Sequence, residues 1–323
     1  MVHDAQFDFY GNRLATCGAD GLINIFAVAE AEPPSFVHSF AAYFLARHNG
    51  PVMKLSWAHP KYGSLLACGG YYRKVQIWKE VTAASWVMVH EYSGHEASVN
   101  TVEWAPSEFG LMLAAGSSDG CVSLVTKITE ERWETQKFLA HEGGVTALSW
   151  ASASSTRMPE SPSSPLKQFV TGGGDQWVKL WTLTEGTFKA ENLHHHTKWV
   201  RDVAWAPSLG FSRQNVASCS EDGNVSVHTL EREQWRHKEV VHLQLPAWRV
   251  SWSVAGNILA VSAGDNQARL YRESPEGSWD LVSRVGERGA VTEDQRTPEA
   301  VANSLTYLFA PTSPPQFSAP PPP

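Results

Sequence analysis

The chain contains many short runs in which large apolar residues alternate with polar or charged residues, and each run predicts a β-strand. One such run is "WVMVHEY" from Trp86, and similar runs begin at Trp133, Phe188, Trp235 and Trp279. Each is preceded by an apolar strand rich in small residues, a turn and a second apolar strand, as in "LAAGSSDGCVSLV". No segment has the period of a long amphipathic helix. The pattern therefore predicts an all-β protein.

These strands belong to a repeat marked by tryptophan, histidine and aspartate. The tryptophans recur at intervals of 46 to 55 residues, and a histidine lies nine residues before four of them. An N-terminal unit has Phe7 at the tryptophan position. Six units of about four strands each predict a six-bladed WD-repeat β-propeller over residues 1–285. The repeated residues are Trp57, Trp104, Trp150, Trp205 and Trp252; His48, His95, His141 and His196; and Asp20, Asp119, Asp175, Asp222 and Asp265.

Three departures from the repeat lead to predictions of their own. Residues 152–165, "SASSTRMPESPSSP", are rich in serine and proline, so we expect an exposed, mobile loop inserted in the fourth unit. The second unit has Tyr72 where the turn aspartate belongs, so its hydrogen bonding must differ. Residues 286–323 end in "SAPPPP", and their proline content predicts a disordered tail.

The two ends of the repeat predict how the ring closes. Propellers usually build their last blade from strands of both chain ends, which leaves no exposed edge. Here the first strand of unit one begins almost at the first residue, and unit six supplies its own fourth strand, "WDLVSRV". We therefore expect a ring that stays open between blades one and six.

The recurring histidine, aspartate and tryptophan are interpreted as structural. A catalytic set would be unique, whereas four similar sets around a ring are explained by hydrogen bonds that lock each blade's loops and turn. His194 and His196 share a strand face and could chelate a metal, but no Cys, Asp or Glu stands at supporting spacing. We favour surface histidines there. We expect no enzyme activity, no catalytic residue, no cofactor and no metal.

Composition narrows the possibilities further. A formal net charge of −7 argues against a nucleic-acid binder that works through bulk positive potential. Cys17, Cys68, Cys121 and Cys219 are widely scattered, which predicts reduced and mostly buried thiols. The chain has no run of apolar residues long enough to span a membrane, and its start does not resemble a secretory leader. These features favour a cytosolic or nuclear protein.

Four segments of the chain resemble a known family. Together they are similar to the Sec-thirteen family, the small WD-repeat subunit of the COPII vesicle coat, and the likeness runs from Val2 to about Val285. The last segment is the most specific, because generic WD repeats do not share it. The insert and the tail depart from the family's pattern, so nothing is carried over to them. The segments are "DAQFDFYGNRLATCGADGLINIF", "WAHPKYGSLLACGGYYRKVQIW", "SVNTVEWAPSEFGLMLAAGSSDG" and "WRVSWSVAGNILAVSAGDNQARLY".

The resemblance implies a non-enzymatic scaffold. In that family the propeller is six-bladed and open, and a larger α-solenoid partner inserts a blade to complete it. One partner is the coat subunit of the COPII outer cage, which acts in transport from the endoplasmic reticulum to the Golgi. Another is a nucleoporin of the Y-shaped nuclear pore complex, and a third assembly is a nutrient-signalling complex at the vacuole or lysosome.

The same resemblance implies where the protein acts. The expected places are the cytoplasm, COPII-coated vesicles, the cytosolic side of the endoplasmic reticulum membrane, and the nuclear pore. Membrane association would be indirect, through the coat, and no direct contact with nucleic acid is expected.

Strands of a partner blade would add along the gap between blades one and six. We expect residues of those two blades to line this seam, namely Phe7, Ile23, Ile25, Trp248, Val250 and Leu270.

Three alternatives remain open. The related nucleoporin propeller of the same Y-shaped complex would bind pore components only. A WD-repeat peptide-binding adaptor would have a self-closed ring with a charged or aromatic pocket at its channel. A propeller hydrolase would need a unique cluster of acidic, tyrosine or metal-ligand residues there.

Overall fold

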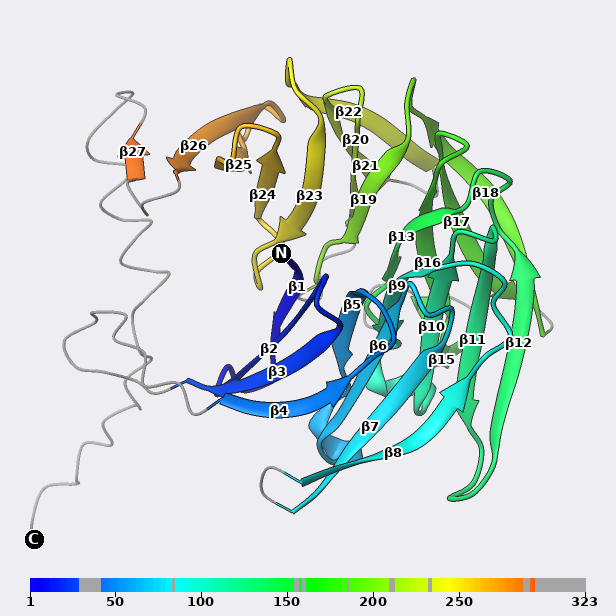
Figure 1. Ribbon diagram of the computed structural model, residues 1–323. Helices are drawn as coiled ribbons and strands as arrows, with labels where there is room; N and C mark the ends of the chain where they lie inside the picture. The colour runs from blue at the N-terminus through cyan, green and yellow to red at the C-terminus, as the bar shows by residue number, and fades with distance from the viewer. Residues whose placement is uncertain are drawn as a thin grey trace, which may run out of the picture.

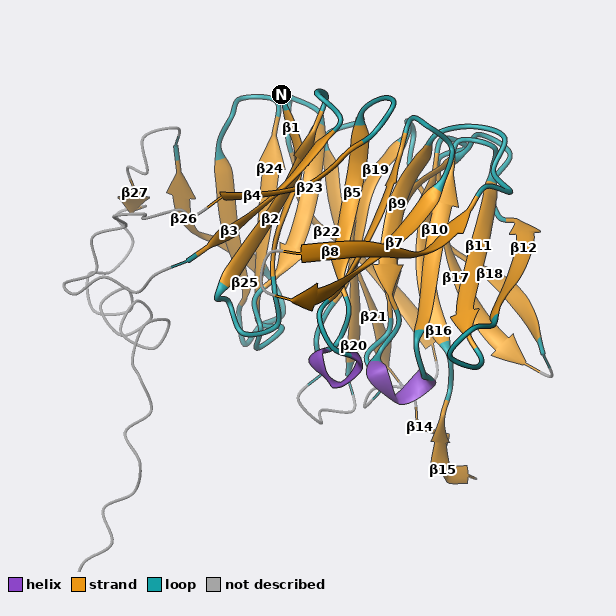
Figure 2. Cartoon of the chain, turned by 60° about the horizontal axis from the view of Figure 1, so that its bottom comes forward, coloured by secondary structure: helices purple, strands orange, loops and turns teal. Residues whose placement is uncertain are grey.

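The protein is a ring of antiparallel sheets that stand around a central axis like the blades of a propeller (Figure 1). The computed structural model describes residues 1–28, 42–82, 85–153, 157–158, 161–184, 186–208, 213–231, 234–286 and 291–293. Six sheets form the ring, and a separate two-stranded hairpin projects from one of its ends (Figure 2). The predicted six-bladed all-β fold is confirmed.

The strands follow one another from the axis outward within each blade. Blade one contains β1 (Val2–Phe7), β2 (Arg13–Gly18), β3 (Leu22–Ala27) and β4 (Ala42–Arg47). Blade two contains β5 (Val52–Trp57), β6 (Leu65–Gly70), β7 (Val75–Thr82) and β8 (Ser85–Tyr92). Blade three contains β9 (Val99–Trp104), β10 (Met112–Ser117), β11 (Cys121–Lys127) and β12 (Trp133–Leu139).

The second half of the ring repeats this order. Blade four contains β13 (Val145–Trp150), β16 (Gln168–Gly173), β17 (Trp177–Thr184) and β18 (Thr187–His195). Blade five contains β19 (Val200–Trp205), β20 (Gln214–Ser220), β21 (Asn224–Glu231) and β22 (Gln234–His242). Blade six contains β23 (Ala247–Trp252), β24 (Ile258–Ala263), β25 (Ala268–Glu273), β26 (Trp279–Val285) and β27 (Val291–Glu293).

Two segments differ from the expectation that they lack regular structure. The insert contains β14 (Arg157–Met158) and β15 (Ser161–Pro165), which form the projecting hairpin, so the prediction of a plain loop over 152–165 is wrong there. β27 lies within the predicted tail and pairs with β26 as a fifth strand of blade six, so the prediction of disorder is wrong for these three residues. The proline content of these two segments concealed all three strands, because pairing depends on the neighbouring strand as well as on composition. The rest of the tail, 287–290 and 294–323, lies outside the described residues.

Helical structure within the described residues is limited to two short 3-10 turns. They are η1 (Pro60–Tyr62) and η2 (Ser107–Phe109), each between the first and second strands of a blade. No helix in the described ranges is long and apolar enough to cross a membrane.

Neighbouring blades pack face to face through a recurring small residue. In blades two, three and four a glycine of the second strand lies against a valine of the next blade's first strand. A Cβ atom added to any of these glycines would come within 2.5 Å of that valine. Blades one and five have the free, buried thiols Cys17 and Cys219 at the same position. The small residues therefore set how closely adjacent blades approach. The three pairs are Gly69 with Val99, Gly116 with Val145 and Gly172 with Val200.

In four blades a tryptophan at the end of the first strand bonds the blade to the preceding one. Its indole N–H donates a hydrogen bond to a backbone carbonyl of the preceding first strand. The bonds run from Trp57 to Gln6 (3.1 Å), from Trp104 to Ser56 (3.0 Å), from Trp150 to Glu103 (3.1 Å) and from Trp252 to Ala204 (3.0 Å). The indole nitrogen of Trp205 has no partner among the described residues. The prediction that these tryptophans belong to a network within their own blade is therefore wrong, because they act between blades.

We expect Trp104→Phe to lower the free energy of unfolding by about 1–3 kcal/mol. The substitution keeps an aromatic side chain at this position, but the buried carbonyl of Ser56 loses its hydrogen-bond donor. Urea unfolding followed by circular dichroism would measure the change. Trp199→Phe is the matched control, since Trp199 is 49% exposed. Equal destabilisation by both substitutions would show that the bond between blades contributes nothing.

Candidate functional site

The ring is not closed by shared strands. Among the described strands, β1 pairs only with β2 and β23 pairs only with β24, so none of them is shared between the first and the last blade. In Figure 1 blades one and six face each other where the colours of the two chain ends meet. A hydrogen bond between described residues crosses from blade six to blade one, donated by the Arg249 guanidinium to the carbonyl oxygen of His3 (3.2 Å).

Burial along the second strands shows which blades lack a neighbour. In β6 and β10 every residue is buried, because blades on both sides cover the sheet. In β2 and β24 burial alternates instead, with Ala15 and Cys17 buried in β2 and Leu259, Val261 and Ala263 buried in β24. Because successive strand residues point to opposite faces, blades one and six each have one face that no other described strand covers. We call these two uncovered faces the seam.

The blade-one face of the seam is mostly apolar. Its rows follow from the strand register, in which Phe7 lies opposite Leu14 and Leu14 lies opposite Phe26. The corresponding residues of blade three are buried against blade two. On blade one, Phe7 is 60% exposed and Leu14 and Phe26 are half-buried. This face therefore has the composition of a packed blade interface without the neighbouring blade. The blade-three residues are Val102, Trp104, Leu113, Ala115 and Val125.

The blade-six face of the seam is flatter and more polar. The register places Ser251, Ala260 and Leu270 in one row and Arg249, Ser262 and Ala268 in the next. All six are exposed or half-buried. Ser262 occupies the position at which blades two, three and four have the glycine that receives the next blade's valine. This face therefore has a small residue where a further first strand would approach.

The structure separates the residues that were predicted to line the seam. Phe7 and Leu270 lie on its two faces. Ile23 and Ile25 are buried against blade two and Val250 against blade five, so these three predictions are wrong. Strand periodicity shows which residues share a face, but it does not show which face meets the gap.

The prediction that Trp248 lines the seam is also wrong. Its ring lines a cavity of about 1360 Å³ at one end of the central channel and lies over the Arg201 guanidinium, 4.9 Å from its carbon to the ring centre. Trp199 flanks the same guanidinium at 5.5 Å.

The predicted histidine network is most complete in blade four. The His141 Nδ1 lies 2.7 Å from an oxygen of Asp175, and its Nε2 lies 2.7 Å from the Thr171 hydroxyl. That hydroxyl also accepts a hydrogen bond from the Trp181 indole N–H (2.8 Å). The chain Asp175–His141–Thr171–Trp181 thus connects the turn to two strands. Thr171 and Trp181 were not singled out from the sequence, although Trp181 stands six residues after the turn aspartate.

Blades three and five contain shorter versions of this network. His95 lies 3.0 Å from Asp119 and 2.8 Å from the Ser123 hydroxyl. Burial alone would raise the pKa of Asp119, but hydrogen bonds from the backbone N–H groups of Glu96 and Cys121 and from His95 hold it well below its usual range. In blade five, His196 lies 3.0 Å from the Ser218 hydroxyl and 3.4 Å from Asp222.

The remaining units differ, as their sequences predicted. In blade two the His48 ring stacks on Tyr72 at 4.7 Å, and the Tyr72 hydroxyl donates to the Cys68 sulfur (3.4 Å). Asp20 and Asp265 each accept a hydrogen bond from the backbone N–H two residues later, which holds the turn. Asp265 also forms an ion pair with the Arg269 guanidinium in β25.

The paired histidines are held in the neutral form. Burial lowers the pKa of His95, His141 and His196, although the aspartate beside each one opposes the shift. Neutral imidazoles that bridge a carboxylate and a hydroxyl account for the hydrogen bonds without any proton transfer. The networks are therefore structural locks between loop, turn and strand.

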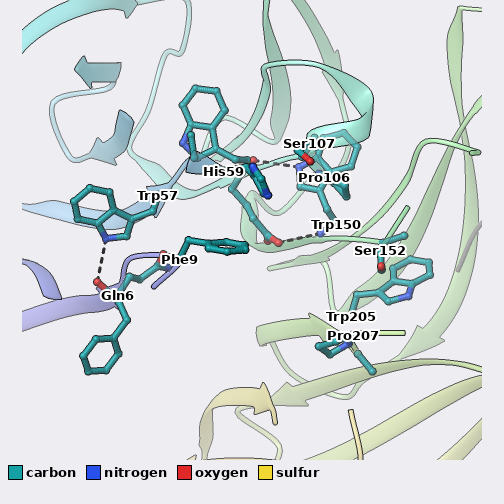
Figure 3. A pocket seen from close by; sticks show the side chains of 17 residues that line it. Gln6, Phe9, Trp57, His59, Pro106, Ser107, Trp150, Ser152, Trp205 and Pro207 are labelled. Atoms are coloured by element: carbon teal, nitrogen blue, oxygen red, sulfur yellow. Dashed lines mark hydrogen bonds between the residues drawn. The ribbon is translucent and has the colours of Figure 1, made fainter. Parts of the chain in front are cut away.

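The other end of the channel holds a smaller cavity of about 430 Å³, around which Figure 3 shows Phe9, Trp57, Trp150 and Pro207. Glu103 lines it, and burial raises the pKa of this carboxyl to about 8 despite a hydrogen bond from the Trp150 backbone N–H. Throughout the part of the chain that the structure describes, no group of three or more His, Cys, Asp or Glu side chains is arranged to hold a metal ion.

Comparison with known proteins agrees with the repeat. The family described as "WD domain, G-beta repeat" matches residues 86–125, 133–182 and 187–229. The chain is 39% identical to a protein named "Protein SEC13 homolog" from Drosophila melanogaster, over 88% of this chain and 80% of that protein. It is 45% identical to a protein of the same name from Dictyostelium discoideum, over 88% and 95%. It is 42% identical to "Protein transport protein sec13" from Emericella nidulans, over 89% and 96%.

We expect Thr171→Val to lower the free energy of unfolding by about 2–4 kcal/mol, because it leaves both the His141 imidazole and the Trp181 indole N–H without their buried partner. Denaturant unfolding would measure the loss. Thr187→Val changes an exposed threonine in the same blade and serves as the control. Similar midpoints for the two variants would contradict the structural role of the network.

Proposed function

The chain belongs to the SEC13 family, and from this premise we propose that it is a non-enzymatic scaffold subunit whose seam receives a β-blade from an α-solenoid partner. The observation that carries the proposal is the pair of uncovered blade faces that meet at one gap. The blade-one face has the apolar positions of an interior blade interface, the blade-six face has a small residue where a further first strand would approach, and no described strand covers either face.

The open surfaces are sheet faces rather than strand edges, so the partner would bind mainly by side-chain packing. An inserted sheet would cover Phe7 and Leu14 on one side and Ala260 and Leu270 on the other. Its strands would hydrogen-bond to one another within the inserted blade, as strands do in the other blades. This arrangement buries apolar area on both faces at once, which is the main favourable contribution to such association.

Two positions specify how an inserted blade would fit. Phe7 stands where the other blades have a tryptophan. Phenylalanine has no N–H group to donate a hydrogen bond to the preceding first strand. Blade one therefore needs no acceptor carbonyl from the inserted blade. Ser262 stands where a glycine or cysteine elsewhere receives the first strand of the next blade. The first strand of the partner's blade should therefore present a small or β-branched residue over Ser262.

The family supports a role in protein transport. Relatives at about 40% identity are named as protein transport proteins. We propose that the partner is the α-solenoid subunit of the COPII outer cage, on the cytosolic side of the endoplasmic reticulum and on its vesicles. An α-solenoid nucleoporin of the Y-shaped nuclear pore complex, and a nutrient-signalling complex at the vacuole or lysosome, would use the same seam. Membrane contact would be indirect, and nucleic acid would not be bound.

The seam also distinguishes this proposal from the alternatives. A peptide-binding adaptor predicts a self-closed ring, whereas the part of the chain that the structure describes shares no strand between the first and last blades. The names of the relatives favour the coat subunit over the related nucleoporin propeller.

We expect Phe7→Glu to weaken binding of the purified solenoid partner at least about tenfold, because a charge would be buried against the inserted sheet. Isothermal titration calorimetry would measure the affinity. Ile128→Glu is the control, since Ile128 is 51% exposed on blade three, away from the seam. Unchanged affinity for Phe7→Glu, with the variant folded, would place the partner elsewhere.

We expect a partner that lacks its blade-forming segment not to co-purify with this propeller, because the solenoid would then have nothing to insert into the seam. Co-expression followed by affinity purification tests this, with the intact partner as the reference. Retention of the truncated partner in equal amount would exclude blade insertion as the mode of binding.

A further inference from the structure

Blades four and five lie side by side in the ring (Figure 1), and four histidine rings contact one another between them. His194 comes from β18 of blade four and His196 from the loop that follows it. His228 comes from β21 and His237 from β22 of blade five. The His194 ring stacks on the His237 ring with centres 4.0 Å apart, and its centre lies 4.7 Å from that of His196 and 5.2 Å from that of His228. The four rings form one continuous cluster.

The cluster leads from solvent to the core. His237 is exposed and His194 is half-buried, whereas His196 and His228 are 2% and 1% exposed. The prediction of surface histidines at 194–196 therefore holds for His195 and is wrong for His196. Inside the blade, His196 and His228 share the hydroxyl of Ser218, at 3.0 Å and 3.1 Å. The cluster thus extends by ring contacts from the exposed His237 to the hydrogen-bonded network of blade five.

The joint between blades three and four has apolar residues at matching places. Phe138 pairs with Val122 in blade three as His194 pairs with Val178 in blade four. Its ring lies 4.8 Å from Trp181 and 5.5 Å from Phe188, centre to centre. Trp181 and Ala190 pair in blade four as His228 and His237 pair in blade five. One joint of the ring is therefore built from aromatic rings that cannot titrate, and the next from rings that can.

Few carboxylates near the cluster could balance the positive charge of protonated histidines. The acidic groups that act on it are Asp222 from the β20–β21 turn, facing His196, and Glu239 from β22, facing His237. His195 adds repulsion from β18 when it is protonated. The Ser226 hydroxyl lies 3.0 Å from the His237 ring nitrogen. Two carboxylates thus face four imidazoles, so full protonation would leave net positive charge between the blades.

We propose that this histidine cluster makes the joint between blades four and five acid-sensitive, so that mild acid separates β18 from β21 and β22 while the apolar joint between blades three and four stays packed. The physical reason is repulsion between stacked imidazolium rings in a partly buried site.

The direction of the pH effect follows from linkage. Burial, together with the neighbouring histidines, lowers the pKa of His194 to about 4 and also lowers the pKa of His196, His228 and His237. An imidazole released into water titrates near 6.5. The open joint therefore takes up protons that the closed joint does not. The closed form is favoured above pH 6.5 and loses that advantage as the pH falls toward 4, with the opening constant rising about tenfold per pH unit for each proton taken up.

Hydrogen–deuterium exchange of the free, full-length chain between pH 4.5 and 7.5 tests the proposal, after correction for the intrinsic exchange rate at each pH. The corrected exchange rate of amides in β18 and β22 should be constant above about pH 6.5 and should rise by about tenfold or more per unit as the pH falls below it. Amides of β12 in the apolar joint should keep a constant corrected rate.

Variants assign the effect to the cluster. His194→Phe introduces the side chain that blade three has at this register, and His237→Ala introduces the one that blade four has. Each should reduce the pH dependence at β18 and β22 at least about tenfold at the acid end of the range. His242→Gln, which changes an exposed histidine of β22 outside the cluster, should leave it intact. If His194→Phe disturbs folding, judged by circular dichroism at pH 7.5, the exposed His237→Ala decides.

Three results would overturn the proposal. They are constant corrected rates at β18 and β22 in the parent protein, equal acid opening of β12, or pH dependence retained in a folded variant. None of these measurements involves the partner, so the outcome is independent of the proposed scaffold function.

Discussion

Face-to-face packing of neighbouring blades is the constraint on which the rest of the structure depends. A four-stranded blade is apolar on both faces, so it is stable only when a blade lies on either side. The glycine–valine contacts set the spacing, and the tryptophan hydrogen bonds set the alignment of successive first strands. A linear series of six blades meets this requirement four times in full. The first and last blades meet it on one face only.

The uncovered faces therefore follow from the same rule that stabilises the interior of the ring. Blade one keeps the apolar positions of a packed face but has Phe7 in place of the donor tryptophan. Blade six keeps a small residue, Ser262, where another first strand would fit. The histidine networks serve a different purpose, since neutral imidazoles connect loops, turns and strands within single blades. The histidine hydrogen bonds stabilise single blades, whereas the seam is the surface at which we propose that a partner binds.

Much of the fold and part of the site could be predicted from the sequence. The repeat of His141, Trp150 and Asp175 in similar spacing elsewhere predicted the blades, and the lack of a spare strand predicted the open ring. The contact partners could not be predicted. Trp150 and Asp175 lie in one repeat, yet the first bonds to blade three and the second to its own blade's histidine. A spacing along the chain does not distinguish these two cases, because both partners lie at similar distances in sequence.

The sequence by itself determined the number of blades, the position of the open joint and the residues that share each strand face. Only the tertiary structure decided that Phe7 and Leu14 face the gap while Ile23 and Ile25 face blade two, and that four histidines from two blades meet in one cluster. The physical reason is that alternation along a strand shows which residues share a face, but not which of the two faces is covered by a neighbouring blade. Which face is covered depends on the twist and the neighbouring blade, and those arise only when the ring forms.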